Sequence, residues 1–546
     1  MSRLFKELVR KRGFSEEYLN PKYERLPSPW LMPDMEAAIK RIKEAGEKRE
    51  RVIIYGDYDA DGVTASTLMD EALRQAGLRV VEIMLPDRFK DGYGMSERIA
   101  ERAKETEAKL VITVDCGSGN KDIVDKLNAI GVDTIITDHH ECPAELPKAV
   151  AVVNPKRKDV HLEKLEYKDY MESGIKDLAG VGVAFMVARG MVKKKLIPKG
   201  QEKWLLDLVV IGTICDSMYM GLTNRILCYY GMKVLEKTRR IGLRELMKSS
   251  RANKITTDTV GFQIGPRLNA AGRMANANIA LKLLRTKSRV EGAKLAEELE
   301  KLNVERKSQQ AVVMREFRER GASSDSVLIT VGEWHEGVLG IVAGKLVEEY
   351  RRPVFVLSRV SGGVLKGSGR SFGEFSLADA LKVCEGTIVG GGGHAGAAGV
   401  KILEEKLDEF REKINGYYNS LGLGNQEKFL MAHADLETSE LGEFTLDFLE
   451  ELKTLEPFGV GNEAPVFGIR NVFVLDKRLL GSDARHLRLF VRGEDGKTMK
   501  LIAFYAPESW RSVETGERLD ILIRVEENEW NGLKSVEGRI LDLRGC

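Results

Sequence analysis

The chain has 546 residues, 43% of them hydrophobic and 31% charged, and this length predicts three or four domains rather than one hydrophobic core. The net charge of +2 provides no whole-chain attraction for nucleic acid, and six cysteines without a Cys-x-x-Cys pair exclude a zinc ribbon and a disulfide framework. No apolar run reaches the roughly 18 residues of a membrane span, and the N-terminus lacks the apolar segment of a signal peptide, so we expect a cytoplasmic protein without membrane contact.

The first half of the chain alternates between predicted strands and helices. Residues 1–45 mix charge, proline and short apolar pieces, and we expect them to form an arm packed on the first domain. Apolar runs then predict strands over 51–56, 80–85, 110–114 and 134–137, with helices over 63–76, 97–105 and 121–130 between them. Such alternation forms a mostly parallel sheet covered on both faces, which binds ligands at the carboxyl ends of its strands.

The pattern changes twice in the second half. A charged insertion over 156–177 precedes helices at 181–192 and 204–214, and a helical stretch ends in the long charged segment 289–320. Strands at 327–331 and 354–357 flank a helix at 338–350, and a Gly-rich segment over 390–396 closes this unit. Strands predicted at 466–475, 486–492, 500–505 and 519–525 favour a small barrel of the oligonucleotide-binding (OB) type.

Carboxylates and imidazoles follow several of the predicted strands. They are Asp57, Asp59, Asp61, Asp115, Asp138, His139 and His140, with Asp216 after a later apolar run. Asp59 and Asp61 are two residues apart, so an extended backbone would direct both carboxylates to one side. A set of carboxylates and imidazoles without thiolates favours Mn2+ or Mg2+, and two such ions about 4 Å apart support phosphoester hydrolysis by water. Each Asp alone is more often a helix cap or a turn residue, so the coincidence at one sheet edge carries the argument.

Two Gly-rich segments and the barrel suggest contacts with a polyanion. Gly391–Gly399 lets the backbone approach a phosphate closely and His394 can donate to it, although by itself this segment reads as a flexible loop. Residues 367–371 offer backbone amides, a hydroxyl and a guanidinium, the groups that bind phosphate, although a plain turn has the same composition. Basic and aromatic residues alternate between 485 and 510, as in proteins that bind single strands, although barrel aromatics also form cores.

The ordered motifs resemble those of a known superfamily. Tyr55–Gly62, Val114–Gly117, Asp138–His140 and Asp216 are similar to the motifs of the DHH phosphoesterases, and Gly390–Gly399 resembles the glycine-histidine motif of their associated domain. Pro266–Met274, Trp334–Ala343 and Leu455–Asn462 resemble the RecJ family of single-strand-specific DNA exonucleases, over nearly the whole chain. This resemblance implies 5'-to-3' hydrolysis of single-stranded DNA to 5'-mononucleotides in DNA recombination and repair.

The resemblance also implies an α/β fold with residue roles. Its parts are the N-terminal arm over 1–45, a parallel-sheet DHH catalytic domain over 46–225, a helical connector over 226–320, a smaller α/β DHH-associated substrate-binding domain over 321–425 and an OB-like single-strand DNA-binding β-barrel over 426–546. Two divalent cations, Mn2+ or Mg2+, would bind to Asp57, Asp59, Asp61, Asp115, His139, His140 and Asp216, all catalytic except Asp57, with Asp138 supporting the histidines. DNA and its phosphates would bind to Arg88, Arg267, Asn269, Arg273, His335, Gly369, Arg370, Ser371, Gly392, Gly393 and His394.

Two other functions fit the same motifs. One is a phosphodiesterase for short oligoribonucleotides or cyclic dinucleotides, and the other is a non-catalytic replication scaffold. The extra barrel argues against the first, and the complete ligand set argues against the second. Expected partners are single-stranded DNA, a single-strand DNA-binding protein and a helicase, with the protein itself a monomer.

Overall fold

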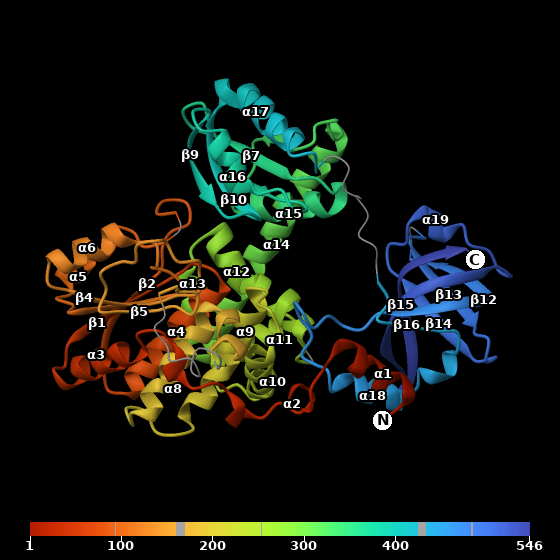
Figure 1. The fold of residues 1–546 in the computed structure, drawn as a ribbon, viewed down its shortest axis with the longest axis horizontal. Coiled ribbons are helices and arrows are strands. Elements are labelled where there is room, and N and C mark those ends of the chain that lie inside the picture. The colour runs from red at the N-terminus through yellow and green to blue at the C-terminus, as the bar shows by residue number, and fades with distance from the viewer. Residues whose placement is uncertain (93, 160–169, 253, 424–432, 482–483, 546) are drawn as a thin grey trace.

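The computed structural model describes residues 1–546 except 93, 160–169, 253, 424–432, 482–483 and 546 (Figure 1). Part of the predicted insertion and the predicted boundary at 425 therefore lie outside the described residues. The described chain forms three sheets, which belong to three units joined by helices and linkers. No described helix combines the length and the apolar character that crossing a bilayer requires.

The first sheet is parallel throughout, with strand order β2-β1-β3-β4-β5. Its strands are β1 (Arg51–Gly56), β2 (Arg79–Met84), β3 (Leu110–Val114), β4 (Asp133–Thr137) and β5 (Ala151–Val153). The connecting helices are α4 (Ala60–Gln75), α5 (Arg98–Glu105) and α6 (Lys121–Ala129). Every residue of β3 is buried, because helices cover both faces of the sheet. The predicted strand and helix order of this unit is confirmed.

A bundle of helices follows the first sheet. It contains α8 (Gly180–Lys193), α9 (Leu206–Cys215), α10 (Leu222–Glu236), α11 (Ile241–Ser249), α12 (Gly265–Met274), α13 (Asn278–Arg285) and α14 (Arg289–Arg320), with the short helices η3 (Ile175–Asp177) and η4 (Gln201–Leu205) and the π-helical η5 (Thr259–Ile264). Ser288 caps α14 by accepting a hydrogen bond from Glu291 N. In Figure 1 this helix leads from the bundle to the second sheet.

The second sheet is mixed, with strand order β6-β7-β8-β10-β9. Its elements are β6 (Leu328–Gly332), α15 (Glu336–Tyr350), β7 (Val354–Val360), β8 (Val364–Arg370), α16 (Leu377–Val383), β9 (Ile388–Gly393), β10 (Ala397–Leu403), η6 (Glu404–Lys406) and α17 (Leu407–Ser420). The expectation of a flexible loop over 391–399 is wrong for most of this segment, because its first three residues end β9, its last three begin β10 and the two strands pair. Glycine fits there because a Cβ on Gly391 would lie 2.8 Å from the carbonyl oxygen of Gly399.

The third sheet closes into a barrel. Its elements are β11 (Leu436–Thr438), η8 (Leu441–Glu443), α18 (Leu446–Lys453), β12 (Phe467–Leu480), β13 (His486–Arg492), β14 (Thr498–Ala503), α19 (Glu508–Arg511), β15 (Arg518–Trp530) and β16 (Leu533–Gly545). Pairing of β12 with β15 closes a ring of five strands, which confirms the predicted OB-like barrel. Strand β16 was not predicted, although its turn residues Asn531 and Gly532 have the positive φ angles of a tight hairpin.

The N-terminal segment contacts both ends of the molecule. Its elements are α1 (Arg3–Arg12), α2 (Glu16–Leu19), η1 (Tyr23–Arg25), η2 (Pro29–Leu31) and α3 (Met35–Glu47). Helix α3 packs on the first unit as expected, but α1 contributes Leu4, Phe5 and Leu8 to the core of the barrel. Arg12 holds Asp435 with two hydrogen bonds of 2.7 Å. The expectation that the whole arm packs on the first domain is therefore wrong for α1 (Figure 1).

Close packing of α9 against α10 predicts a sensitive glycine. A Cβ on Gly231 would lie 2.6 Å from Cβ of Val210 and 2.8 Å from the carbonyl oxygen of Leu206. We expect Gly231→Ala to lower the free energy of unfolding by about 1–3 kcal/mol through overpacking, measured by denaturant unfolding. Gly416→Ala in α17, where a Cβ meets nothing within 4 Å, is the matched control and should be stabilising by up to about 1 kcal/mol. Equal effects of the two substitutions would contradict the packing argument.

Candidate metal centre and nucleic-acid interface

The first turn of α4 positions two aspartates. Asp59 caps the helix by accepting a hydrogen bond of 3.0 Å from Gly62 N. Asp61 accepts hydrogen bonds from the backbone amides of Gly180 (2.6 Å) and Val181 (3.0 Å), at the start of α8. The prediction that an extended backbone directs Asp59 and Asp61 to one side is therefore wrong. Asp59 is instead the N-cap of α4, and Asp61 lies in the first turn of that helix.

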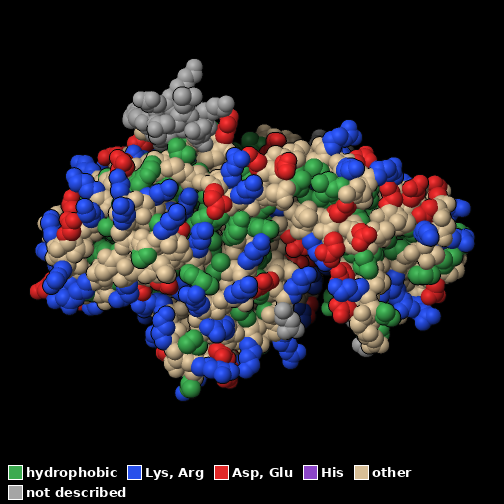
Figure 2. Space-filling model, turned by 90° about the horizontal axis from the view of Figure 1, so that it is seen from below, with side chains coloured by type: hydrophobic (Ala, Val, Ile, Leu, Met, Phe, Trp, Pro, Cys, Tyr) green, Lys and Arg blue, Asp and Glu red, His purple; other side chains and the backbone are tan. Residues whose placement is uncertain are grey.

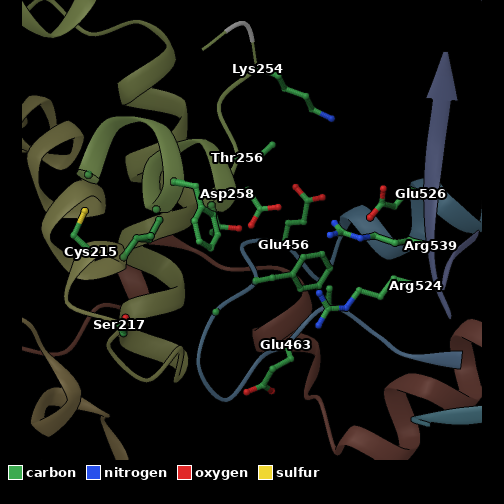
Figure 3. A pocket seen from close by; sticks show the side chains of 18 of the residues that line it. Cys215, Ser217, Lys254, Thr256, Asp258, Glu456, Glu463, Arg524, Glu526 and Arg539 are labelled. Atoms are coloured by element: carbon green, nitrogen blue, oxygen red, sulfur yellow. The ribbon is translucent and has the colours of Figure 1, made fainter. Parts of the chain in front are cut away.

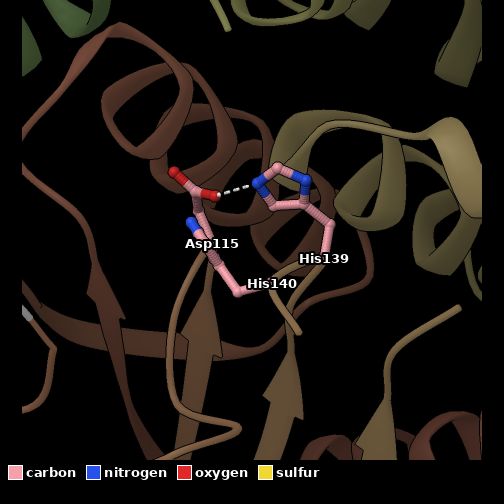
Figure 4. Close-up of side chains that lie close together, drawn as sticks. All are labelled: Asp115, His139 and His140. Carbon is pink, nitrogen blue, oxygen red and sulfur yellow. Dashed lines mark ion pairs between the residues drawn. The ribbon is translucent and has the colours of Figure 1, made fainter. Parts of the chain in front are cut away.

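Asp115 directly follows β3 and has a φ of +61°, a left-handed conformation that Asp tolerates better than most residues. Its backbone amide donates to the carbonyl of Thr137 at 2.9 Å, which holds this turn beside β4. Its Oδ1 atom lies 3.1 Å from Nε2 of His139 (Figure 4). A Cβ on Gly180 would overlap this carboxylate, so the glycine allows α8 to approach it.

Asp138 orients the two histidines rather than facing the other carboxylates. Its carboxylate accepts hydrogen bonds from the amides of His139 (2.7 Å), His140 (3.1 Å) and Ser118 (2.9 Å). It also lies 2.8 Å from Nδ1 of His140. Burial alone would raise the pKa of Asp138, but the hydrogen bond and the charge of His140 lower it. With Nδ1 held by a carboxylate, Nε2 of His140 is the nitrogen available to a metal.

The ligand atoms form overlapping groups in which all members lie within 4.8 Å of one another. These groups are Asp57 with Asp59 and Asp115, Asp61 with His139 and Asp216, and Asp115 with His139 and His140. Asp216, the C-cap of α9, has Oδ2 3.5 Å from Nε2 of His139. The seven residues thus come from the ends of β1, β3, β4 and α9 and from the start of α4. Asp115 and His139 each belong to two groups. The two oxygens of the Asp115 carboxylate could serve both cations, whereas the Nε2 atom of His139 would bind only one.

Burial makes this cluster electrostatically unfavourable without cations. Desolvation, reinforced by neighbouring carboxylates, raises the pKa of Asp57 to about 8 and that of Asp216 to about 7. The same causes raise the pKa of Asp61 and Asp115 well above the ordinary value. The buried Oδ1 atom of Asp115 accepts no hydrogen bond from any described residue. Oxygen-rich ligands with imidazole nitrogens fit Mn2+ or Mg2+.

A cluster of four arginines adjoins the carboxylates. Arg88 interacts electrostatically with Asp57 and Arg273 with Asp59, while Arg306 interacts with Arg273 and Arg370 with Arg88. Burial lowers the pKa of Arg273 to about 10, with Arg88 and Arg306 lowering it further and Asp59 opposing them. Burial and the charge of Arg88 also lower the pKa of Arg370. The guanidinium of Arg88 lies 5.1 Å from the centre of the Tyr58 ring. Among the ion pairs found between described residues, none includes Arg88, Arg273, Arg306 or Arg370, so this cluster suits an anion.

Arg306 was not among the residues predicted to contact DNA. It lies in α14, which the charge pattern predicts to be a solvated connecting helix, and nothing in its spacing marks it out. Only the packing of α14 against α12 brings it to Arg273.

Other predicted phosphate contacts have partners within the protein. Arg267 pairs with Glu300 and donates to the carbonyl of Gln263, and its contact with phosphate stays a prediction. Asn269 accepts a hydrogen bond of 2.8 Å from Ala60 N, so it supports the start of α4. Ser371 donates to the carbonyl of Phe375, and Gly369 packs on Phe355.

The remaining predicted contacts lie on the second unit. His335 caps α15, and its ring contacts Phe89 edge to face at 5.5 Å, which brings the first and second units together. Gly392 and Gly393 are exposed at the end of β9. The exposed His394 accepts a hydrogen bond of 3.2 Å from Gly396 N.

A groove of about 880 Å³ connects the arginine cluster to the barrel. Asn269, Arg273 and Arg306 line one end, and Arg524 and Arg539 of the barrel line the other. Figure 3 shows these two arginines pointing from the barrel toward the space in front of Asp258 and Glu456. Basic and acidic side chains are mixed over the face shown in Figure 2.

The chain is similar to known proteins over its whole length. The family "DHH family, N-terminal domain" matches residues 51–213, "DHHA1 domain" matches 324–420 and "RecJ OB domain" matches 435–542. The single-stranded-DNA-specific exonuclease RecJ of Bacillus subtilis is 34% identical over 99% of this chain and 69% of its own, and that of Dickeya dadantii is 33% identical over 93% and 90%. The crystal structure of RecJ from Thermus thermophilus in complex with Mn2+ has a TM-score of 0.85 at 27% identity, over 100% of this chain and 76% of that one.

Without divalent cations, we expect the protein to lose stability as the pH rises. The raised pKa values of Asp57 and Asp216 mean that the folded state binds protons that the unfolded chain has already released. Stability should therefore fall between about pH 6.5 and pH 8, above the range in which His139 titrates in the unfolded chain. The melting temperature of chelator-treated protein measures this fall, and Mn2+ should restore stability most at the upper end.

A matched pair of substitutions checks the origin of this pH dependence. Asp115→Asn removes one buried charge and should flatten the dependence, whereas Asp122→Asn on the exposed side of α6 should leave it unchanged. A melting temperature of the cation-free protein that rises over this range would argue against the electrostatic account.

Proposed function

The chain belongs to the RecJ family of single-stranded-DNA-specific exonucleases, and from this membership we propose that it hydrolyses single-stranded DNA from the 5' end, releasing 5'-mononucleotides in DNA recombination and repair. The observation that carries the proposal is the set of three overlapping ligand groups next to the arginine cluster. A metal pair next to an anion site is what hydrolysis of a terminal phosphodiester requires.

We assign the metal ligands to Asp57, Asp59, Asp61, Asp115, His139, His140 and Asp216. When bound, two Mn2+ or Mg2+ ions lower the pKa of water and neutralise charge on the phosphate oxygens. Burial lowers the pKa of His139 to about 3, so its ring is neutral and can act as a ligand at physiological pH. Asp138 keeps His140 in the tautomer that directs Nε2 toward the ligand groups.

The arginine cluster would set the direction of cleavage along the DNA strand. Arg88 acts electrostatically on both Asp57 of the ligand set and Arg370 of the second unit, so it is near both. A terminal 5' phosphate held by Arg88 and Arg370 fixes the distance from the strand end to the cations. Arg273 and Arg306 then face the following phosphates at the mouth of the groove.

The two alternative functions fit less well. A short oligoribonucleotide or cyclic dinucleotide has no use for a groove that continues to the barrel. A scaffold that lacks catalysis has no need of a ligand set with every predicted member in place. The cytoplasmic location, the monomeric state, the proposed domain boundaries and partnership with a single-strand DNA-binding protein or a helicase stay predictions.

Loss of Asp115 or His139, each of which belongs to two ligand groups, should abolish hydrolysis. We expect Asp115→Asn or His139→Ala to lower the rate of mononucleotide release from labelled single strands by at least about 100-fold, since even supporting residues of metal sites have effects of 10- to 100-fold. Binding of single-stranded DNA should be retained, because neither residue belongs to the arginine cluster. Asp122→Asn is the control. Full activity of either ligand variant, or of the protein in excess chelator, would refute the two-metal proposal.

The preference for a 5' phosphate and the direction of cleavage test the proposed anion site. Replacing Arg370 with Ala should raise KM for 5'-phosphorylated strands by about tenfold, the effect of losing one charge-assisted contact of roughly 1.4 kcal/mol, and should raise it less for 5'-hydroxyl strands. Arg359→Ala is the matched control, because Arg359 is an exposed arginine on β7 that pairs with Glu404. Strands labelled at the 5' or 3' end show where cleavage starts, and cleavage from the 3' end would rule out the proposed pocket.

A further inference from the structure

A buried arginine outside the catalytic site joins three segments that are distant in sequence. Arg225 lies in α10 and is fully buried. Its Nε atom donates to the carbonyl of Tyr18 at 2.5 Å, and its two terminal nitrogens donate to the carbonyls of Leu455 (2.6 Å) and Thr454 (2.7 Å). Its guanidinium also lies 4.4 Å from the centre of the Tyr18 ring. One side chain therefore contacts the N-terminal segment and the entrance to the barrel at the same time.

The acceptors of Arg225 explain why its charge is tolerated. Thr454 and Leu455 directly follow α18, so their carbonyls lie at the negative end of that helix. The Tyr18 ring adds a cation–π contact. Lysine could keep the charge but not the planar fork that reaches three carbonyls.

The segment that Arg225 holds also forms a wall of the groove. Residues 454–466 link α18 to β12, and Glu456, Phe458 and Gly459 from this linker line the groove opposite η5 and α12. The linker is fixed further by Asn462, whose side chain donates to the carbonyls of Leu455 and Pro457 at 2.9 Å. The amide of Met220, five residues before Arg225, donates to the carbonyl of Val460 at 2.7 Å.

The N-terminal segment completes the junction. Helix α1 is part of the barrel core, and Tyr18 hydrogen-bonds to the carbonyl of Met220 at 3.1 Å. The barrel is therefore attached to the helical bundle through the linker and through the N-terminal segment. Arg225 donates hydrogen bonds both to the linker and to the N-terminal segment.

We propose that Arg225 is a positioning residue: it fixes the barrel against the helical bundle and so sets the width of the groove through which single-stranded DNA reaches the metal centre. This inference rests on the proposed function for its substrate. Its structural part concerns the DNA-free protein alone.

Substrate length separates a positioning role from a general structural one. In Arg225→Lys, KM for a 5'-phosphorylated strand of about 20 nucleotides should rise about tenfold, because the strand reaches the displaced barrel, while kcat stays within about twofold. For a 5'-phosphorylated trinucleotide, which ends before the barrel, both constants should be unchanged. Arg189→Lys is the matched control, since Arg189 is also largely buried, but its hydrogen bonds to described residues go to the N-terminal segment and to its own helix.

Small-angle X-ray scattering of the DNA-free variants tests the same idea without activity. Arg225→Lys should broaden the distribution of distances within the molecule, and Arg189→Lys should not. If Arg225→Lys does not fold, Tyr18→Leu removes the ring contact from the N-terminal side and should give the same length-dependent KM. Unchanged scattering and KM, or the same changes in the Arg189 variant, would overturn the proposal. A wild-type protein inactive on single-stranded DNA would instead contradict the proposed function, with the scattering result still interpretable.

Discussion

Repulsion among the aspartates at the carboxyl edge of the parallel sheet is the constraint on which the rest of the structure depends. Asp61 and Asp115 are almost completely removed from water, and neighbouring carboxylates reinforce the desolvation that raises their pKa values. Burying an unpaired carboxylate costs roughly several kcal/mol, even after the protein relaxes around it. Cations that bind only the folded cluster remove this cost, so the groups that perform the chemistry also connect metal binding to folding stability.

The surrounding fold meets this constraint through close backbone approach. The start of α8 directs two amides at Asp61, and the positive end of a helix partly offsets the negative charge. Gly180 and Gly212 allow α8 and α9 to approach, because a Cβ at either position would overlap an aspartate of the cluster. The ligands are thus positioned by packed helices and strand ends. Their geometry depends on the same contacts that form the core.

Local sequence patterns predicted the first sheet well. The predictions that failed concern residues whose structure depends on segments distant in sequence. The bounds of β3 and the order of the parallel unit follow from apolar runs and helical spacing, which each segment encodes by itself. The His139–His140 pair and the strand-end aspartates were likewise visible in sequence. The strand character of Gly390–Gly393 was not, because its hydrogen bonds come from β10. Arg225 and Arg306 could not be singled out, since their roles depend on segments far away in the chain.

The location of α1 has a consequence for how the protein is made. Leu4, Phe5 and Leu8 leave the ribosome long before the strands that bury them, because the barrel core includes β16, which ends at Gly545. Domains generally fold in the order of synthesis, but this helix has no complete core to enter until β16 has been made. Helix α1 is therefore synthesised before both α/β units but buried after them, and its apolar face stays exposed until the barrel strands follow.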